Sequence, residues 1–362
     1  MHDHTMTSQI PEQLASIQEK GKTLTDSAIA VSRVAAKLRA DQPSPREQGL
    51  LCDMALPLRQ TFFPLGFAVA ILTNRHEVLT AAEASFGHRG LQYDDTQFAV
   101  RIGVSEGMSR QTPPPPVRRA YNHLYTMVAD PENQAVLDLR AGSSFVWLNE
   151  SALEDPVYLR HNFLEKVIYL LLGASVVTDI HAACVSRQGK GILLCGDSGA
   201  GKSTLSYACA RAGWTYTSDD TCYLLNSSDE PRVVGHSHRV RFRPEAQAFF
   251  PELREREITP RMEGKPSIEV SVSELPPLST SNEAAVRAVV YLRRSSAVRP
   301  ALIPLPHGSA TQLMSEELYS AGEIRMKHQT ILERLAGIPT FELHYQRLEE
   351  AISQLDQLVA SL

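Results

Sequence analysis

Short apolar runs separated by polar turns alternate along most of the chain with longer apolar segments at helical spacing. Between residues 51 and 150 a short helix is predicted over 77–85, and the short runs predict strands at 66–72, 98–104, 125–128, 135–139 and 144–148. Farther along, a longer apolar segment predicts a helix over 155–173. Further short runs predict strands at 179–185, 191–195, 214–217 (with 221–225 continuing extended), 285–292 and 340–344.

The order of these segments predicts an α/β protein with two parts. A smaller α+β N-terminal domain over 51–150 precedes a mixed-sheet α/β domain over 155–345. Apolar residues at helical spacing over 346–362 predict a closing amphipathic helix. Residues 1–50 are polar at both ends and hold a loosely periodic apolar stretch, so we expect a helical or partly disordered leader there.

Composition places the chain among ordinary globular proteins, with 43% apolar and 21% charged residues. The formal net charge of −5 argues against nucleic acid as a partner, because binding to a phosphate backbone requires a basic face. The longest apolar stretch, 167–177, is too short to span a bilayer, and no signal peptide is visible. We therefore expect a cytoplasmic protein that binds neither nucleic acid nor membrane, and self-association into a homo-oligomer stays open.

Residues 196–204 read Gly-Asp-Ser-Gly-Ala-Gly-Lys-Ser-Thr and match G-x-x-x-x-G-K-[ST], the phosphate-binding loop or Walker A motif. The predicted strand 191–195 directly precedes it and a helix-forming stretch follows, which is the context that this loop requires. Glycines let backbone N–H groups surround a polyphosphate, and the start of a helix adds its positive dipole end. The motif predicts a nucleotide site formed by Gly196, Asp197, Ser198, Gly199, Ala200, Gly201, Lys202, Ser203 and Thr204.

Within this loop, Lys202 would reach the β- and γ-phosphates and the Ser203 hydroxyl would bind Mg²⁺. A second metal ligand is expected from the pair Asp219 and Asp220, at the end of the strand that follows the loop helix. Neighbouring side chains on a strand point to opposite faces, so one carboxylate can bind Mg²⁺ while the other orients or deprotonates the acceptor hydroxyl. Alternation does not decide between them. We assign Asp219 as the base and Asp220 as the metal ligand; the alternative is a solvated carboxylate pair.

Basic residues outside the loop are candidates for phosphate or substrate contacts. Arg241 and Arg243 alternate along a predicted strand and would share one face of it. Lys265 lies in a polar segment suited to a mobile loop over the site. Ordinary surface charge is the alternative for all three residues.

The order of these features resembles the catalytic core of bacterial HPr kinase/phosphorylase, whose phosphate-loop fold is similar to the nucleotide domain of phosphoenolpyruvate carboxykinase. The resemblance rests on His181 in an apolar strand, on the loop over 196–203 and on Ser-Asp-Asp over 218–220. It is clear over 181–225 and weaker out to about 345. It implies a mixed-sheet phosphate-loop kinase fold, ATP and Mg²⁺ as cofactors, His181 beside the transferring phosphate, and the aspartate pair serving a serine hydroxyl. Without the resemblance, a lone histidine in an apolar strand is more often a core residue.

The chain has no match to the Glu-Ile-Arg-Gly-Leu-Gly signature of that family, which is tied to dephosphorylation by phosphate. This difference argues against phosphorylase activity and against the carrier protein HPr as the acceptor. The resemblance is greater to divergent members that phosphorylate a serine. We expect an ATP-dependent serine kinase acting on a protein or peptide, with Lys202, His181, Asp219 and Asp220 in catalysis. The alternatives are a nucleotide-sensing regulatory ATPase without phosphotransfer and a kinase for a small hydroxylated metabolite.

Overall fold

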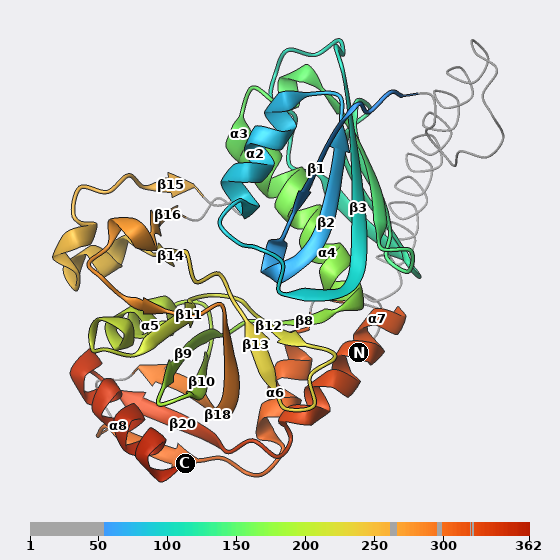
Figure 1. The fold of residues 1–362 in the computed structure, drawn as a ribbon. Helices are drawn as coiled ribbons and strands as arrows, with labels where there is room; N and C mark the ends of the chain where they lie inside the picture. The colour runs from blue at the N-terminus through green and yellow to red at the C-terminus, as the bar shows by residue number, and fades with distance from the viewer. Residues whose placement is uncertain (1–53, 261–265, 295–298, 319, 321) are drawn as a thin grey trace, which may run out of the picture.

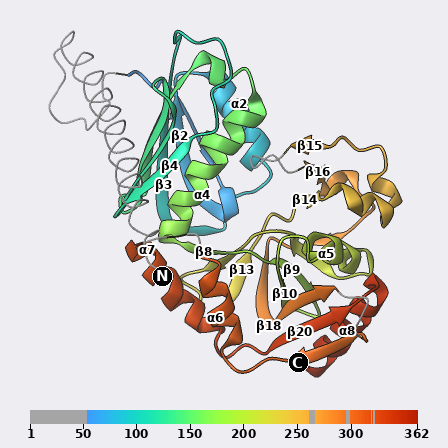
Figure 2. The same ribbon diagram turned by 180° about the vertical axis from the view of Figure 1, so that it is seen from behind.

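The computed structural model describes residues 54–260, 266–294, 299–318, 320 and 322–362. The expected leader over 1–50 and the candidate Lys265 lie outside these residues. Within them the chain is a mixed α/β structure built on two large sheets and one small sheet (Figure 1). The two large sheets occupy separate parts of the molecule, which Figure 2 shows from the opposite side. These parts are named below the N-terminal unit (β1 to α4) and the C-terminal unit (β8 to α8).

A mixed sheet, seven-stranded over the described residues, forms the N-terminal unit, in the order β1-β2-β3-β7-β6-β5-β4. The β2–β3 and β3–β7 pairs are parallel and the other pairs are antiparallel. The strands are β1 (Leu58–Phe62), β2 (Phe67–Thr73), β3 (Tyr93–Ser105), β4 (Val117–Tyr121), β5 (Leu124–Asp130), β6 (Asn133–Asp138) and β7 (Ser143–Asn149). These bounds confirm the five strands predicted between 66 and 148, and α2 (His76–Phe86) confirms the short helix. The strands β1 and β4 have no counterpart among the predicted ones.

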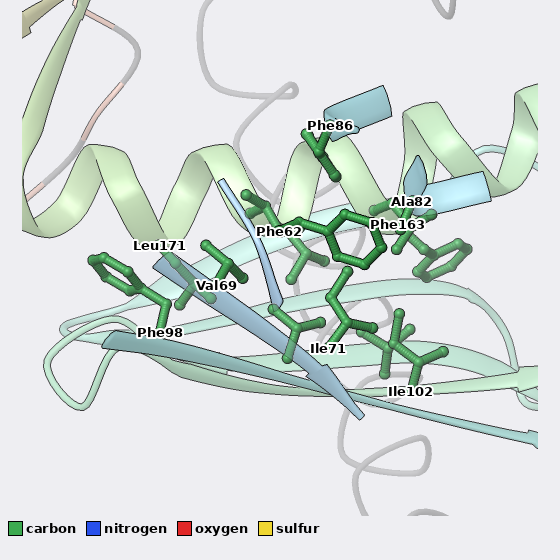
Figure 3. Close-up of a cluster of buried hydrophobic side chains, with 14 of the residues drawn as sticks. Phe62, Val69, Ile71, Ala82, Phe86, Phe98, Ile102, Phe163 and Leu171 are labelled. Carbon is green, nitrogen blue, oxygen red and sulfur yellow. The ribbon is translucent and has the colours of Figure 1, made fainter. Parts of the chain in front are cut away.

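One face of this sheet is buried against helices. Along β2 every second residue is buried, as the alternating pattern predicts. Figure 3 shows Val69 of β2 beside Leu171 of α4 and Ile71 of β2 near Ile102 of β3, in the buried cluster that also contains Phe86 of α2. A fully buried side chain of this kind contributes about 1.5–3 kcal/mol, so this apolar layer is the main stabilising contact of the N-terminal unit.

The helix predicted over 155–173 is present but is not uniform. It consists of α3 (Pro156–Leu159), a π-helical turn (Arg160–Glu165) and α4 (Lys166–Ser175). Asp155 caps its start, because Oδ1 accepts hydrogen bonds from the backbone N–H groups of Val157 at 2.9 Å and Tyr158 at 3.0 Å. A π-helical turn changes which side chains face a neighbour, and an apolar pattern does not reveal it.

The C-terminal unit is built on a mixed sheet that has ten strands over the described residues. Its central strands β10 (Lys190–Cys195), β18 (Glu283–Arg294) and β20 (Thr340–Tyr345) run parallel and confirm the strands predicted at 191–195, 285–292 and 340–344. The other strands of this sheet are β8 (Val177–Ile180), β9 (Ala183–Arg187), β11 (Thr215–Ser218), β12 (Cys222–Leu225), β13 (Arg232–Val234), β17 (Ser279–Thr280) and β19 (Ala301–Pro304). A separate three-stranded sheet, again over the described residues, contains β14 (Arg239–Phe242), β16 (Pro266–Ser271) and β15 (Thr259–Pro260).

Helices cover both faces of the central strands, which explains why β10 is buried without alternation from Gly191 to Cys195. On one face Leu194 shares a buried cluster with residues of α5 (Lys202–Arg211) and α8 (Leu348–Ser361). On the other face Leu193 shares a cluster with residues of α6 (Ser309–Glu316) and α7 (Gly322–Leu332). The bounds of α8 confirm the closing helix. Short 3-10 turns lie at Pro64–Gly66, Glu150–Ala152, Pro244–Ala248, Pro251–Leu253, Val272–Glu274 and Glu333–Leu335.

The predicted strand 179–185 is broken in the structure and divides into β8 and β9. The strand predicted at 214–217 is confirmed by β11, and the extended residues 221–225 form β12 after a bend. The strand β8 pairs with β12, whereas β9 pairs with β11. The two stretches therefore change their positions in the sheet together, each at its own bend. An apolar run continues through such a change, because both halves are buried, and the prediction of one strand over 179–185 was wrong for this reason. The residues at the two breaks are 181–182 and 219–221.

A bilayer-spanning helix would need about 20 apolar residues. No helix in the described part of the chain is long and apolar enough to cross a membrane.

Candidate functional site

The phosphate-loop motif lies between β10 and α5, with its glycines in backbone conformations that other residues adopt rarely. The φ angles are +140° at Gly196, +95° at Gly199 and +98° at Gly201. At Gly201 a Cβ atom would also lie 2.7 Å from the Tyr345 hydroxyl oxygen, so this position requires glycine for two separate reasons. The sequence spacing therefore follows from the shape of the loop.

Lys202 begins α5 and turns its ammonium group back over the loop. Its Nζ donates to the carbonyl oxygens of Gly196 at 2.6 Å and Asp197 at 3.3 Å, and it lies 3.1 Å from Nε2 of His181. The side chain is buried, with 6% of the residue exposed. Burial lowers the pKa of Lys202, and the nearby charge of Asp220 opposes this effect. A buried cation is thus held at the loop, where a polyphosphate would bind.

His181 and Asp220 meet because the two strand breaks lie side by side. The Nδ1 atom of His181 is 3.8 Å from Oδ1 of Asp220, and each side chain is about one-third exposed (31% and 34%). The Cys222 thiol donates to the carbonyl oxygen of Ala182 at 3.2 Å and joins the two bends. The expectation that His181 lies within an apolar strand was wrong: it occupies a bend and faces the loop lysine.

Asp219 lies beside Asp220 in the same bend but is buried, with 4% of the residue exposed. Its Oδ1 accepts from the Tyr216 hydroxyl at 3.1 Å, and its Oδ2 accepts from the backbone N–H of Arg241 at 3.0 Å. Its backbone carbonyl accepts from the Ser203 hydroxyl at 3.3 Å. Burial, and next the charge of Asp220, raises the pKa of Asp219 to about 6. The two aspartates directly follow β11, as expected, but they lie in the bend before β12 and not on a strand, so strand alternation does not set the directions of their side chains.

Of the two candidate arginines, only Arg243 brings its guanidinium to the loop. The strand β14 ends at Phe242, and Arg243 follows it with Nη2 donating to the Ser198 hydroxyl at 2.7 Å. Arg241 instead directs its guanidinium to Glu269. The expectation of one shared strand face was wrong, because the strand stops between the two residues.

Two residues at the loop were missed by the sequence interpretation. Arg293 lies with Nη1 3.5 Å from Oδ2 of Asp197, and the Tyr345 hydroxyl donates to the carbonyl oxygen of Ala200 at 3.1 Å. Each directly follows a stretch predicted as a strand. Because parallel strands end at one edge of a sheet, the residues after 292 and 344 could have been considered together with Gly196.

The residues present are compatible with a nucleotide and Mg²⁺. The buried ammonium of Lys202, the glycine conformations and the Ser203 hydroxyl suit an anionic phosphate chain. No group of three or more His, Cys, Asp or Glu residues that could hold a metal ion occurs within the described ranges. Mg²⁺ in nucleotide sites takes one or two protein ligands and completes its shell with phosphate oxygens and water, so Ser203 and one aspartate would suffice.

Comparisons with known proteins give little beyond this geometry. No family model matches the chain, and no curated protein matches it. A solved structure described as the Hpr(Ser) kinase/phosphatase from Coxiella burnetii is similar to part of it, at 13% sequence identity, covering 51% of this chain and 99% of that chain, with a TM-score of 0.27. A likeness at this TM-score carries no conclusion about fold or function, so the functional argument rests on the residues of the site.

Proposed function

We propose that this chain is an ATP-dependent serine kinase of the HPr kinase-like type, which transfers the γ-phosphate to a serine hydroxyl on a protein or peptide. The observation that supports it most is the convergence of Lys202, His181 and Asp220 beside the phosphate loop. A loop that only binds nucleotide needs the lysine and the glycines. A histidine and a carboxylate beside that lysine are groups that can orient or deprotonate an acceptor hydroxyl, which nucleotide binding alone does not need.

The loop residues 196–204 would hold ATP through backbone N–H groups and the Lys202 ammonium. On nucleotide binding, the ammonium would exchange the carbonyl oxygens of Gly196 and Asp197 for phosphate oxygens. Arg243 and Arg293 would add positive charge at the mouth of the loop. In the structure Arg243 donates a hydrogen bond to the Ser198 hydroxyl, and Arg293 forms an ion pair with Asp197. Bound Mg²⁺ would neutralise charge on the phosphates.

The two aspartates differ in access to an acceptor. Asp219 is buried and both of its carboxylate oxygens accept hydrogen bonds, whereas one-third of the Asp220 side chain is exposed next to His181. We therefore reverse the assignment made from sequence and propose Asp220 as the group that orients or deprotonates the serine hydroxyl. Asp219, whose backbone carbonyl oxygen accepts from the Ser203 hydroxyl, would serve the metal. Catalysis would rest on positioning and charge neutralisation.

The test compares phosphoserine-containing proteins in cells that lack the gene and carry the wild type, Lys202→Ala or Lys190→Ala. Lys190 lies at the start of β10, the strand that precedes the loop, and its ammonium donates to the Val359 carbonyl oxygen, so it is a matched control. We expect phosphoserine sites that appear with wild type and Lys190→Ala and disappear with Lys202→Ala, and that purified protein modifies with ATP. Purified wild type that binds Mg-ATP yet phosphorylates none of these sites would contradict kinase activity and favour a nucleotide-sensing ATPase.

A further inference from the structure

A buried carboxylate lies where the two units meet, outside the proposed active site. Glu165, the last residue of the π-helical turn, accepts from the Ser85 hydroxyl of α2 at 3.0 Å. It also contacts Nδ1 of His161 at 3.0 Å, Nη2 of Arg160 at 3.3 Å and Nη1 of Arg239 at 3.4 Å. Burial alone would raise the pKa of Glu165, but the hydrogen bond from His161 and the charge of Arg239 hold it well below its ordinary value. Three contacts come from the N-terminal unit, and the fourth crosses to the C-terminal unit.

Arg239 connects that carboxylate to the aspartate bend. Its side chain is as buried as that of Glu165, at 9% exposed each, and its Nη1 also lies 3.6 Å from Oε1 of Glu269. Its backbone carbonyl accepts from the Tyr216 hydroxyl at 2.9 Å, the same hydroxyl that contacts Asp219. Two residues along β14, the Arg241 N–H donates to Asp219. Arg239 and Arg241 therefore present side chains to acidic partners and backbone groups to the bend.

The apolar residues of β14 hold one side of it: Val240 and Phe242 are buried in a cluster with Tyr207 of α5 and Tyr216 of β11. Within its three-stranded sheet it pairs only with β16, where Arg241 lies opposite Glu269. The Glu165–Arg239 ion pair is its charged connection to the N-terminal unit. Without the Glu165 charge, the buried Arg239 guanidinium keeps Glu269 as its remaining carboxylate partner, and we expect it to be displaced toward Glu269. The displaced partner here carries the carbonyl and the strand that contact Tyr216 and Asp219.

We propose that Glu165 is a positioning residue: through Arg239 it holds β14 against the Asp219 bend and so links the N-terminal unit to the active site. This inference rests on the proposed kinase function for its consequence in catalysis. Its structural part, the link from Glu165 to the Arg241 N–H, stands on the contacts alone.

The same boundary provides a matched control. Glu283 also joins the units, with Oε2 accepting from the Tyr93 hydroxyl at 2.5 Å and from Gln92 at 2.8 Å. Its Oε1 accepts from Arg232 at 3.0 Å. These contacts lead to β13 and β18 and not to β14. Glu283→Gln therefore removes an inter-unit carboxylate of similar size without touching the proposed link.

The first measurement is hydrogen–deuterium exchange resolved to the Arg241 amide, in wild type, Glu165→Gln and Glu283→Gln without nucleotide. We expect exchange at Arg241 to accelerate by about tenfold or more in Glu165→Gln and to stay at the wild-type rate in Glu283→Gln. Equal exchange in all three proteins overturns the proposal. If Glu165→Gln does not fold, Arg239→Lys, which keeps the charge and shortens its reach, takes its place with the same expected result.

The second measurement is phosphotransfer by the same variants. Glu165→Gln should lower kcat by roughly 10- to 100-fold, as a displaced reacting group does, while KM for Mg-ATP changes little. Glu165→Asp should recover part of the rate, and Glu283→Gln should leave kcat unchanged. An equal loss in both Gln variants overturns the positioning role. If wild type transfers no phosphate at all, the proposed function fails, and the exchange result still decides the link.

Discussion

Two histidine rings stack where the N-terminal unit meets the segment before β14, and they make a measurable prediction about acid stability. His88 and His238 lie with ring centroids 3.4 Å apart at an interplanar angle of 26°. Burial, and next the charges of Arg89 and Arg239, lowers the pKa of His88 to about 4. Burial, followed by His88 and the same arginines, lowers the pKa of His238 to about 2.

The sign of the effect follows from these directions. In the unfolded chain a histidine titrates near pH 6.5, so above that pH both states are neutral and the pair contributes no pH dependence. Below pH 6.5 the two histidines bind protons in the unfolded chain but stay neutral in the folded protein, so the free energy of unfolding falls as pH falls. For His238 alone the loss at pH 5 is about 2 kcal/mol. For His88 we expect less, because part of this residue is exposed and solvent screens its charge.

The variant His238→Phe isolates this contribution, since it keeps an aromatic ring on His88 and removes one titrating group. Urea unfolding at pH 7.5 and at pH 5 should show a loss of unfolding free energy on acidification that is about 2 kcal/mol larger in wild type than in the variant. Asp219, whose raised pKa adds stability below pH 6, acts in the opposite direction but equally in both proteins. An equal loss on acidification in both proteins would refute the account of the histidine pair.

Further predictions concern the site itself. Asp220→Asn should slow phosphotransfer by roughly 10²–10⁴-fold with Mg-ATP affinity nearly intact, whereas Asp219→Asn should weaken Mg-ATP binding and transfer together. Single-turnover kinetics measures the transfer, and calorimetry measures the binding. The opposite division of effects would restore the assignment made from sequence. Arg243→Ala should reduce nucleotide affinity by roughly tenfold, because the Arg243 guanidinium lies at Ser198 of the loop, and Arg241→Ala should reduce it less. Equal affinities of the two variants, measured by calorimetry, would count against a phosphate contact from Arg243. No pyrophosphate should form from inorganic phosphate and phosphorylated HPr, since the phosphorylase signature is missing, and its detection by enzyme-coupled assay would show that the signature is dispensable here.

Local patterns in the sequence predict much of the fold. Alternation along β2 and continuous apolar character along β10 follow from burial on one face and on both faces of a sheet, and the structure has these strands where they were predicted. The break after β8 and the change of neighbour between β11 and β12 could not be predicted in this way. They depend on which strands pair, β8 with β12 and β9 with β11, and a buried strand has the same apolar composition whichever neighbour it has.

The candidate site shows the same division. The motif predicts the loop, because its glycines are required by the backbone conformation of nine consecutive residues. The approach of His181 to Asp220 requires both strand breaks to lie together, and the approach of Arg243 to Ser198 requires the separate three-stranded sheet. Neither contact leaves a local signal. Tyr345 and Arg293 did leave one, as the residues that directly follow predicted parallel strands.

The most direct test of the central claim is nucleotide binding at the loop, measured as thermal protection by Mg-ATP of wild type, Lys202→Ala and the control Lys190→Ala. With ATP at about 100 times its Kd, wild type and Lys190→Ala should gain about 2.7 kcal/mol of stability. Lys202→Ala should gain none, because it lacks the ammonium that now lies 2.6 Å from the Gly196 carbonyl oxygen. A wild-type protein whose melting temperature shifts with neither ATP nor GTP would contradict the account, as would protection that persists undiminished in Lys202→Ala.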